Sequence, residues 1–278
     1  MRTEDNTMVD PFQDLKRKRF WRRAVWTAFA LVALALLTLL VFRMKGGSED
    51  VEGVFESSIE TSAIRVLGQD SSTVAYAERM DTVISGRPLR IFIPHHATPR
   101  LRVGQPDERT LQAVMGFQAA DVRADNYEIL GDFVVAGEQL SRGSSKKGFC
   151  AVVDGKVTIG MAEETPLLNE AIEKKGYFFR QYPLVSVGAP IDNKPKGKTV
   201  RKALCVRGGQ VFVVFSLQEE NFTDFARTLA DLGVDDAIYL IGSDASFGWT
   251  IDASGAREQY GNVDLRPEYR NESYIFWE

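Results

Sequence analysis

The chain has 278 residues, 26% of them charged and 44% hydrophobic, with a formal net charge of −4. Residues 46–278 carry 25 Lys and Arg against 34 Asp and Glu, so this part of the chain is distinctly acidic. An acidic domain has no excess cations with which to release the counterions of nucleic acid, which argues against a DNA or RNA partner. A segment of this length is long enough to bury the core of one large domain.

Residues 24–42 form an uncharged, mostly apolar run. As a helix these residues would span roughly 28 Å, close to the ~30 Å hydrocarbon core of a membrane. A cleavable signal peptide is the alternative, but its apolar region usually has only about 7–15 residues. The run therefore predicts a retained signal anchor, a single transmembrane helix in the lipid bilayer.

Basic residues before this run set the predicted topology. Six Lys and Arg stand between residues 16 and 23, whereas only Arg43 and Lys45 follow closely. Lys and Arg that flank a transmembrane helix are found mainly on its cytoplasmic side. We therefore expect residues 1–23 to be a cytoplasmic tail of a single-pass protein of the inner (cytoplasmic) membrane. Residues 43–53 read as a tether, and residues 54–278 as a periplasmic or otherwise extracytoplasmic globular domain.

The first elements beyond the tether are strands. The run 89–94 predicts a strand that ends at a proline, and 127–140 predicts another, with Gly131 as a bulge. The pattern of 107–123 fits a helix at its start and a buried strand later, and both alternatives stay open.

The second half of the chain repeats one order of elements. Residues 149–161 predict a hairpin that turns at Asp154-Gly155, because this pair accepts a positive φ. A helix follows from the cap Thr165 to Gly176. Hairpin, helix and strand then recur at 202–217, 221–233 and 237–242, with 247–252 as a possible partner of the last strand. This order predicts an α/β (α+β) domain with a mixed β-sheet and a hairpin-helix-strand pseudo-repeat.

Several familiar sites are absent from the sequence. His95 and His96 are adjacent, so in an extended chain they point to opposite faces and do not suit one metal ion or a catalytic triad. Residues 196–199 resemble the end of a phosphate-binding loop but lack its first glycine. We expect no metal and no cofactor. Cys150 and Cys205 lie in apolar runs that predict buried thiols, and a disulfide stays open as the alternative.

Three polar patches lie at the ends of predicted strands, where ligand sites of α/β sheets gather. They are Arg180 with Gln181, Arg201, and the segment that holds Ser243, Asp244 and Ser246. Each patch has a plain alternative: the solvent-facing side of a strand, an edge charge, and an ordinary turn.

The runs GFCAVVDGKVTIG, GYFFRQYPLVSVG, KGKTVRKALCVRGGQVFVVFS and FARTLADLGVDDAIYLIGSDASFGW resemble the phosphodiester glycosidase family over roughly 127–262. This family includes enzymes that remove N-acetylglucosamine from sugar-phosphate diesters, and bacterial cell-envelope proteins. The family pattern Leu-Asp-Gly-Gly-x-Ser corresponds here to 240–246, where Ile241 stands in place of the aspartate. The family's Asn-Gly-Gly-Phe-Phe is absent as well, and its nearest counterpart is 116–121.

The resemblance implies a hydrolase of glycosyl phosphodiesters or envelope glycans. It implies that Arg180 and Arg201 hold the phosphate, with Gln181, Ser243 and Ser246 as further substrate contacts. Asp244 and Asp121 are the acid/base candidates, because glycosidic cleavage ordinarily uses two carboxylates. The alternative is a non-catalytic member of the same fold that binds a sugar phosphate, an envelope glycan or a protein.

Overall fold

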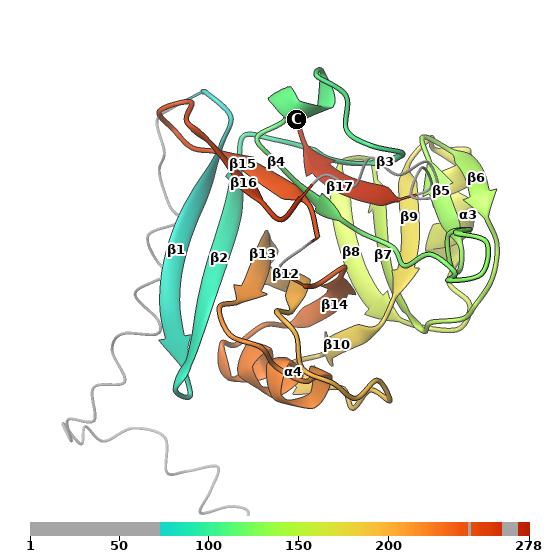
Figure 1. Cartoon of the computed structure of the whole chain (residues 1–278). Helices are drawn as coiled ribbons and strands as arrows, with labels where there is room; N and C mark the ends of the chain where they lie inside the picture. Colours follow the sequence, from blue (N-terminus) through green and yellow to red (C-terminus); the bar gives the residue numbers. More distant parts are fainter. Residues whose placement is uncertain (1–72, 244–245, 263–271) are drawn as a thin grey trace, which may run out of the picture. The chain divides into compact units, whose positions relative to one another are not determined.

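Antiparallel hairpins dominate the computed structural model, which describes residues 73–243, 246–262 and 272–278. The largest sheet has the order β1-β2-β13-β12-β14-β10-β11 (Figure 1). Its strands are β1 (Tyr76–Ile84), β2 (Arg87–His95), β10 (Pro183–Ser186), β11 (Ala189–Pro190), β12 (Lys202–Arg207), β13 (Gln210–Ser216) and β14 (Asp236–Leu240).

Two five-stranded sheets complete the described part of the chain. The second sheet has the order β16-β15-β4-β17-β3 and the third has the order β6-β5-β9-β7-β8. The second comprises β3 (Pro99–Val103), β4 (Met115–Gln118), β15 (Gly248–Ile251), β16 (Arg257–Tyr260) and β17 (Ser273–Trp277). The third comprises β5 (Phe133–Val135), β6 (Glu138–Ser141), β7 (Gly148–Val153), β8 (Lys156–Met161) and β9 (Tyr177–Gln181).

The described residues contain two α-helices, each of which packs on one sheet. Helix α3 (Pro166–Glu173) begins at Thr165, whose side chain accepts from the backbone N–H of Leu167. Helix α4 (Phe222–Asp231) begins at Asn221, which accepts from the N–H of Asp224. A short 3₁₀ turn, η1 (Thr110–Gln112), precedes β4. Helix α4 packs on the large sheet and α3 on the third sheet.

The predicted α/β class with a mixed sheet is wrong: every pair of neighbouring strands in the three sheets is antiparallel, and strands far outnumber helices. The sheets are antiparallel because of the partner that the strand after each helix takes. In both halves that strand lies beside the first strand of its hairpin, β9 beside β7 and β14 beside β12. Each helix therefore connects two strands that run in the same direction. These two strands do not pair with each other, because the first strand of the hairpin lies between them and is antiparallel to both.

Three segments differ from their predictions. The stretch 127–140 is no single strand, because Ala136 and Gly137, both with positive φ, turn the chain between β5 and β6. The run 247–252 contains β15, which pairs with β4 and β16 in the second sheet rather than with β14. The open segment 107–123 holds η1 and β4.

A common core joins the three sheets. It takes Phe92 and Leu204 from the first sheet, Phe117 from the second, and Phe133 and Phe179 from the third. Burial of such side chains stabilises each by about 1.5–3 kcal/mol relative to exposure. Because the strands are fixed from both sides by this core, the loops at their ends are held in place.

The predicted anchor at 24–42, the tail 1–23 and the tether 43–53 lie outside the described residues. Within the described ranges no helix is long and apolar enough to cross a membrane. The extracytoplasmic placement of the domain stays a prediction. Cys150 and Cys205 are free thiols, buried in β7 and β12 of different sheets.

Candidate functional site

The ends of four strands, β4, β9, β12 and β14, come together where the three sheets adjoin. The backbone N–H of Ile241, just after β14, donates to the carbonyl of Gln118 in β4 at 3.1 Å. The backbone N–H of Tyr239 in β14 donates to the carbonyl of Tyr182, just after β9, at 2.9 Å. Lys202, the first residue of β12, pairs with the last residue of β14. The predicted convergence of strand ends is thus present, although the sheets are antiparallel.

A buried lysine lies on one side of this junction. Lys146 precedes β7, and its ammonium donates to the side-chain oxygen of Gln181 at 2.8 Å and to the carboxylate of Asp121. The ammonium also lies 4.5 Å from the centre of the Tyr182 ring, a cation–π contact. The side chain of Lys146 is only 5% exposed, whereas that of Asp121 is 27% exposed. The ion pair therefore has a buried cationic end and an anionic end that reaches solvent.

Burial lowers the pKa of Lys146 to about 7. The physical cause is the loss of hydration, which disfavours the charged form of an amine. The Asp121 carboxylate acts in the opposite direction, since a neighbouring negative charge favours the ammonium.

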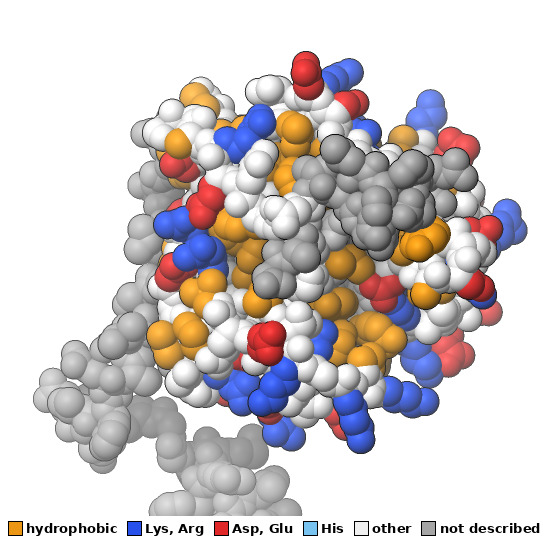
Figure 2. Space-filling view, in the orientation of Figure 1, with side chains coloured by type: hydrophobic (Ala, Val, Ile, Leu, Met, Phe, Trp, Pro, Cys, Tyr) orange, Lys and Arg blue, Asp and Glu red, His pale blue; other side chains and the backbone are white. Residues whose placement is uncertain are grey.

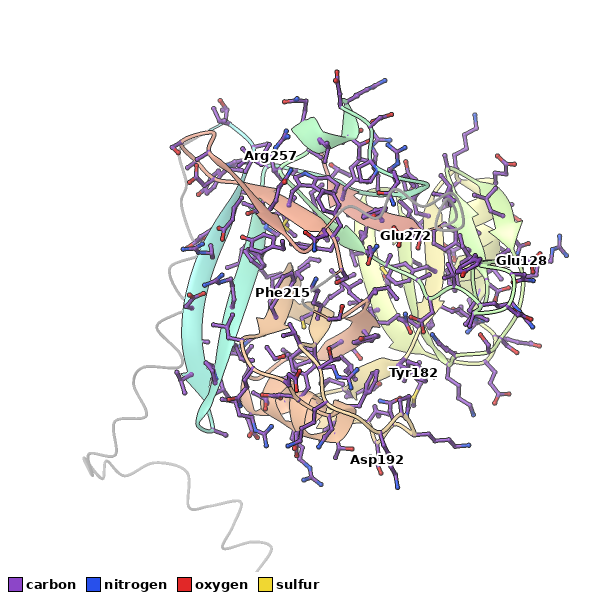
Figure 3. The ribbon with its side chains drawn as sticks, viewed as in Figure 1. Glu128, Tyr182, Asp192, Phe215, Arg257 and Glu272 are labelled. Carbon is purple, nitrogen blue, oxygen red and sulfur yellow. The ribbon has the colours of Figure 1, made fainter. Side chains whose placement is uncertain are left out.

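A second buried lysine lies at the start of β12. The ammonium of Lys202 donates to the carbonyl of Ser246 at 2.9 Å and to its hydroxyl at 2.5 Å. It also lies 4.7 Å from the centre of the Phe215 ring. Phe215 is labelled in Figure 3, near the end of β13. The Ser246 hydroxyl is within 3.0 Å of the Ile241 carbonyl and 3.1 Å of the Ser243 carbonyl. Lys202 thus fixes the turn that follows β14.

The structure gathers most of the predicted polar residues at this junction. Asp121 and Gln181 share Lys146, while Ser243 and Ser246 lie together in the turn fixed by Lys202. Asp244 lies outside the described residues. We call the group of Asp121, Lys146, Gln181, Lys202, Ser243 and Ser246 the junction site.

Arg180 lies on the other face of β9 from Gln181. Its guanidinium is 2% exposed and its Nε donates to the carboxylate of Asp132 at 2.7 Å. The two terminal nitrogens donate to the carbonyls of Lys146 at 3.4 Å, Ala162 at 2.8 Å and Glu163 at 2.7 Å. These contacts tie β9 to the loops on either side of β7 and β8, away from the ammonium groups of the junction site.

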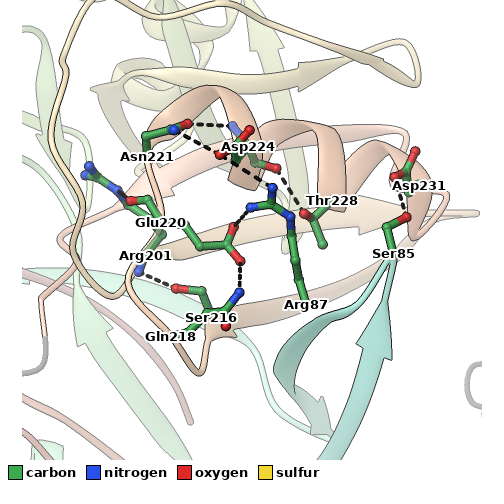
Figure 4. Close-up of polar contacts among 10 residues, drawn as sticks. All are labelled: Ser85, Arg87, Arg201, Ser216, Gln218, Glu220, Asn221, Asp224, Thr228 and Asp231. Carbon is green, nitrogen blue, oxygen red and sulfur yellow. Dashed lines mark hydrogen bonds and ion pairs between the residues drawn. The ribbon is translucent and has the colours of Figure 1, made fainter.

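Arg201 also faces away from its neighbour Lys202, because successive side chains of a strand alternate. Its guanidinium lies 4.2 Å from the Phe222 ring and donates to the carbonyl of Gly197 at 2.6 Å. It also donates to the carbonyl of Glu220 at 2.9 Å (Figure 4). The buried Glu220 carboxylate pairs with Arg87 at 3.3 Å. Burial raises the pKa of Glu220. Arg201 therefore anchors the chain around residue 220.

Sequence reasoning missed both lysines. Lys146 stands in the polar run 143–147, and Lys202 stands beside Arg201. One signal was available for Lys202, since a lysine that opens the apolar run ALCV is unusual in a buried strand. No comparable local signal exists for Lys146.

The junction site offers two ammonium groups, one solvent-accessible carboxylate and several neutral donors. Buried ammonium groups and hydroxyls suit a phosphate or another anion, since charge-assisted hydrogen bonds are the strong ones. Hydrophobic side chains show in the middle of the face seen in Figure 2, with charged side chains of both signs around it. Among the residues that the structure describes, no group of three His, Cys, Asp or Glu is arranged to hold a metal ion.

Comparison of the sequence with known proteins finds no matching family model and no matching curated protein. Comparison of the fold does find relatives. The catalytic domain of zebrafish N-acetylglucosamine-1-phosphodiester alpha-N-acetylglucosaminidase, auto-inhibited by its pro-peptide, superposes with a TM-score of 0.52 at 10% identity. The match covers 75% of this chain and 84% of that domain.

A hypothetical protein from Synechocystis gives a TM-score of 0.51 at 13% identity, over 72% of this chain and 61% of the other. At such identities a similarity establishes the fold and not the activity. The described domain is therefore related at the level of the fold, and distantly, to the catalytic domain of a phosphodiester glycosidase.

Proposed function

We propose that the chain is a glycosidase-like hydrolase that cleaves a glycosyl phosphodiester, with the junction site as its active site. The observation that carries the proposal is the pairing of Asp121 with the buried ammonium of Lys146. A second buried ammonium, Lys202, holds Ser246 at another of the strand ends that form the junction. The fold shared with a phosphodiester glycosidase domain supports the same class of reaction.

The chemistry of the leaving group explains how one carboxylate can suffice. Most glycosidases need a carboxylic acid as well, because the departing alkoxide must be protonated. A phosphodiester instead expels a phosphate monoester, which is already a stable anion. A cation that neutralises its developing charge can replace the acid. The two lysines would supply this cation.

The proposed step is a hydrolysis at the anomeric carbon. Asp121 takes a proton from a water molecule, and the water oxygen forms a bond to the anomeric carbon. The bond from that carbon to the phosphate oxygen breaks, and its electron pair leaves with the phosphate. The products are a free sugar and a phosphate monoester held against Lys146 and Lys202. Gln181 and the Ser246 hydroxyl would position the substrate.

Arg180 and Arg201 take no part in this step as we propose it. Both guanidinium groups already donate to protein carbonyls, and Arg180 also pairs with Asp132. Both also face away from the junction site, since the side chains of Arg180 and Arg201 point to the opposite faces from those of Gln181 and Lys202. The predicted phosphate contact is therefore assigned to the lysines instead.

A non-catalytic binding protein of the same fold is the second candidate. The observation in its favour is Ile241, which supplies no carboxylate where the family pattern has an aspartate. The Asp121 carboxylate is also engaged by Lys146, which lowers its strength as a base. Such a protein would bind a sugar phosphate or an envelope glycan without cleaving it.

The test uses the purified full chain and a panel of α-linked sugar phosphodiesters, with release of free reducing sugar as the readout. Asp121→Asn and Lys146→Met should each abolish turnover. Asp125→Asn is the matched control, because Asp125 is an exposed carboxylate that pairs only with neighbouring Arg123 at 3.0 Å in the described contacts. Binding without turnover would refute the hydrolase and support the non-catalytic binding protein. Neither binding nor turnover would refute both.

A further inference from the structure

A hollow with a volume of about 520 Å³ lies on the outer side of the third sheet. Arg180 and Asp132 line it from the sheet, Ser144 from the loop before β7, and Pro166, Leu168 and Asn169 from the start of α3. This volume is in the range of pockets for small molecules. Because Arg180 and Gln181 point to opposite faces of β9, the hollow is separate from the junction site.

The lining combines a buried cation with a spare donor and several hydrogen-bonding groups. Arg180 is 2% exposed and has five N–H donors. The contacts of the described residues use its Nε–H, both Nη1–H groups and one of the two Nη2–H groups. One Nη2–H therefore stays available to an acceptor in the hollow. Ser144 and Asn169 are exposed at its rim and add a hydroxyl and an amide.

The charge of the lining argues against an anion. Asp132, Glu163 and Glu164 outnumber the single cation Arg180, and Glu163 is itself paired with Lys147 at 2.7 Å. A metal ion does not fit either, since the described residues contain no suitable group of three ligands. A ligand for this hollow must both donate to carboxylates and accept from Arg180, and a hydroxyl group does both with one atom.

Sugars meet these requirements. Their hydroxyls donate and accept, and their C–H faces can pack on the apolar side chains of Pro166 and Leu168. We propose that this hollow is a secondary binding site for a neutral saccharide, independent of hydrolysis at the junction site. Its contact with that site is indirect, through the hydrogen bond from Arg180 to the Lys146 carbonyl.

The test is saturation-transfer NMR of the full chain with maltose, cellobiose and N,N′-diacetylchitobiose as neutral probes, and glucuronic acid as an anionic one. Ser144→Trp should fill the hollow and abolish the signal of the neutral probe that binds. Ser145→Trp is the matched control, because this neighbour is equally exposed and does not line the hollow. It should leave the signal unchanged.

Turnover of a phosphodiester with a single sugar should be the same in Ser144→Trp and in the unaltered chain, so the outcome does not depend on the proposed hydrolase. The inference fails if no neutral probe gives a signal, if glucuronic acid binds instead, or if Ser144→Trp keeps the signal. Loss of the signal in both tryptophan variants would also overturn it, because the site would then lie elsewhere.

Discussion

Replacement of Lys146 by methionine should separate stability from function. The variant keeps the volume of the side chain but removes an ammonium that is 5% exposed. The two partners of this ammonium keep other hydrogen bonds or contact with water. Gln181 still accepts the N–H of Tyr182 at 3.0 Å, and Asp121 is exposed enough to be hydrated. We therefore expect Lys146→Met to fold, to be at least as stable as the unaltered chain, and to be inactive.

The magnitude follows from the pKa of the buried amine. An ordinary lysine has a pKa of 10.5, and burial lowers that of Lys146 to about 7. At 1.36 kcal/mol per pKa unit, this difference corresponds to a destabilisation of about 5 kcal/mol below neutral pH. Loss of the ammonium also leaves Asp121 without its partner, so we expect Lys146→Met to gain less than this, up to about 5 kcal/mol below neutral pH.

The sign of the pH dependence is fixed by proton counting. Between pH values of about 7 and 10.5 the unfolded chain binds more protons at Lys146 than the folded chain does, so the stability of the unaltered protein rises with pH. Methionine does not titrate. The advantage of Lys146→Met should therefore be largest below about pH 7 and shrink as the pH approaches that of free lysine.

Urea denaturation at a series of pH values measures this difference, since the free energy of unfolding extrapolates from each curve. Lys147→Met is the control, because Lys147 is exposed and its partner Glu163 is exposed too. Its free energy of unfolding should track that of the unaltered chain at every pH. A Lys146→Met variant that is less stable at acidic pH, or whose advantage does not change with pH, would refute the reasoning.

Three further predictions concern packing and burial. Gly116→Ala would place a Cβ 2.2 Å from the Trp249 ring, so thermal denaturation should show a loss of about 1–3 kcal/mol or more, and an unchanged Tm would contradict this packing. Asp132→Asn leaves the guanidinium of Arg180 buried without its counter-charge, which should cost about 3–5 kcal/mol in urea denaturation; a loss below about 1 kcal/mol would show that the carbonyls suffice. Burial raises the pKa of both cysteine thiols, so neither should react with a thiol reagent before unfolding, and rapid labelling of the native chain would contradict their burial.

Local signals predicted the individual elements well. Asp154-Gly155 turns a hairpin, with both residues at positive φ, and Thr165 caps a helix, because each of these signals acts within a few residues. The pairing of distant strands has no such signal. Nothing near β15 indicates that it pairs with β4, more than 100 residues earlier, so the sheet assignment and the fold class were wrong.

The candidate site was predictable only in part, because its residues come from strands that lie far apart in the sequence. Strand ends flagged Gln181 and Ser246, which the structure does bring to one junction. Whether a charged residue faces that junction depends on the alternation of its strand and on what covers it. Arg201 and Lys202 differ by one position and face opposite ways. Lys146 is buried only because β9 and the segment around Asp121 close over it.

The acidic composition of the domain and the cationic character of its junction site are compatible. Residues 46–278 have 25 basic and 34 acidic side chains, but salt screens charges that lie more than about 8–10 Å apart at the surface. The ammonium groups of Lys146 and Lys202 are buried, where the lower dielectric strengthens their attraction for an anion. A ligand with one phosphodiester would meet these local cations and the single carboxylate of Asp121, whereas a polymer with a charge on every unit would also have to lie along the acidic surface. If the proposed function is correct, the junction site should bind a single phosphodiester in preference to nucleic acid, for one and the same electrostatic reason.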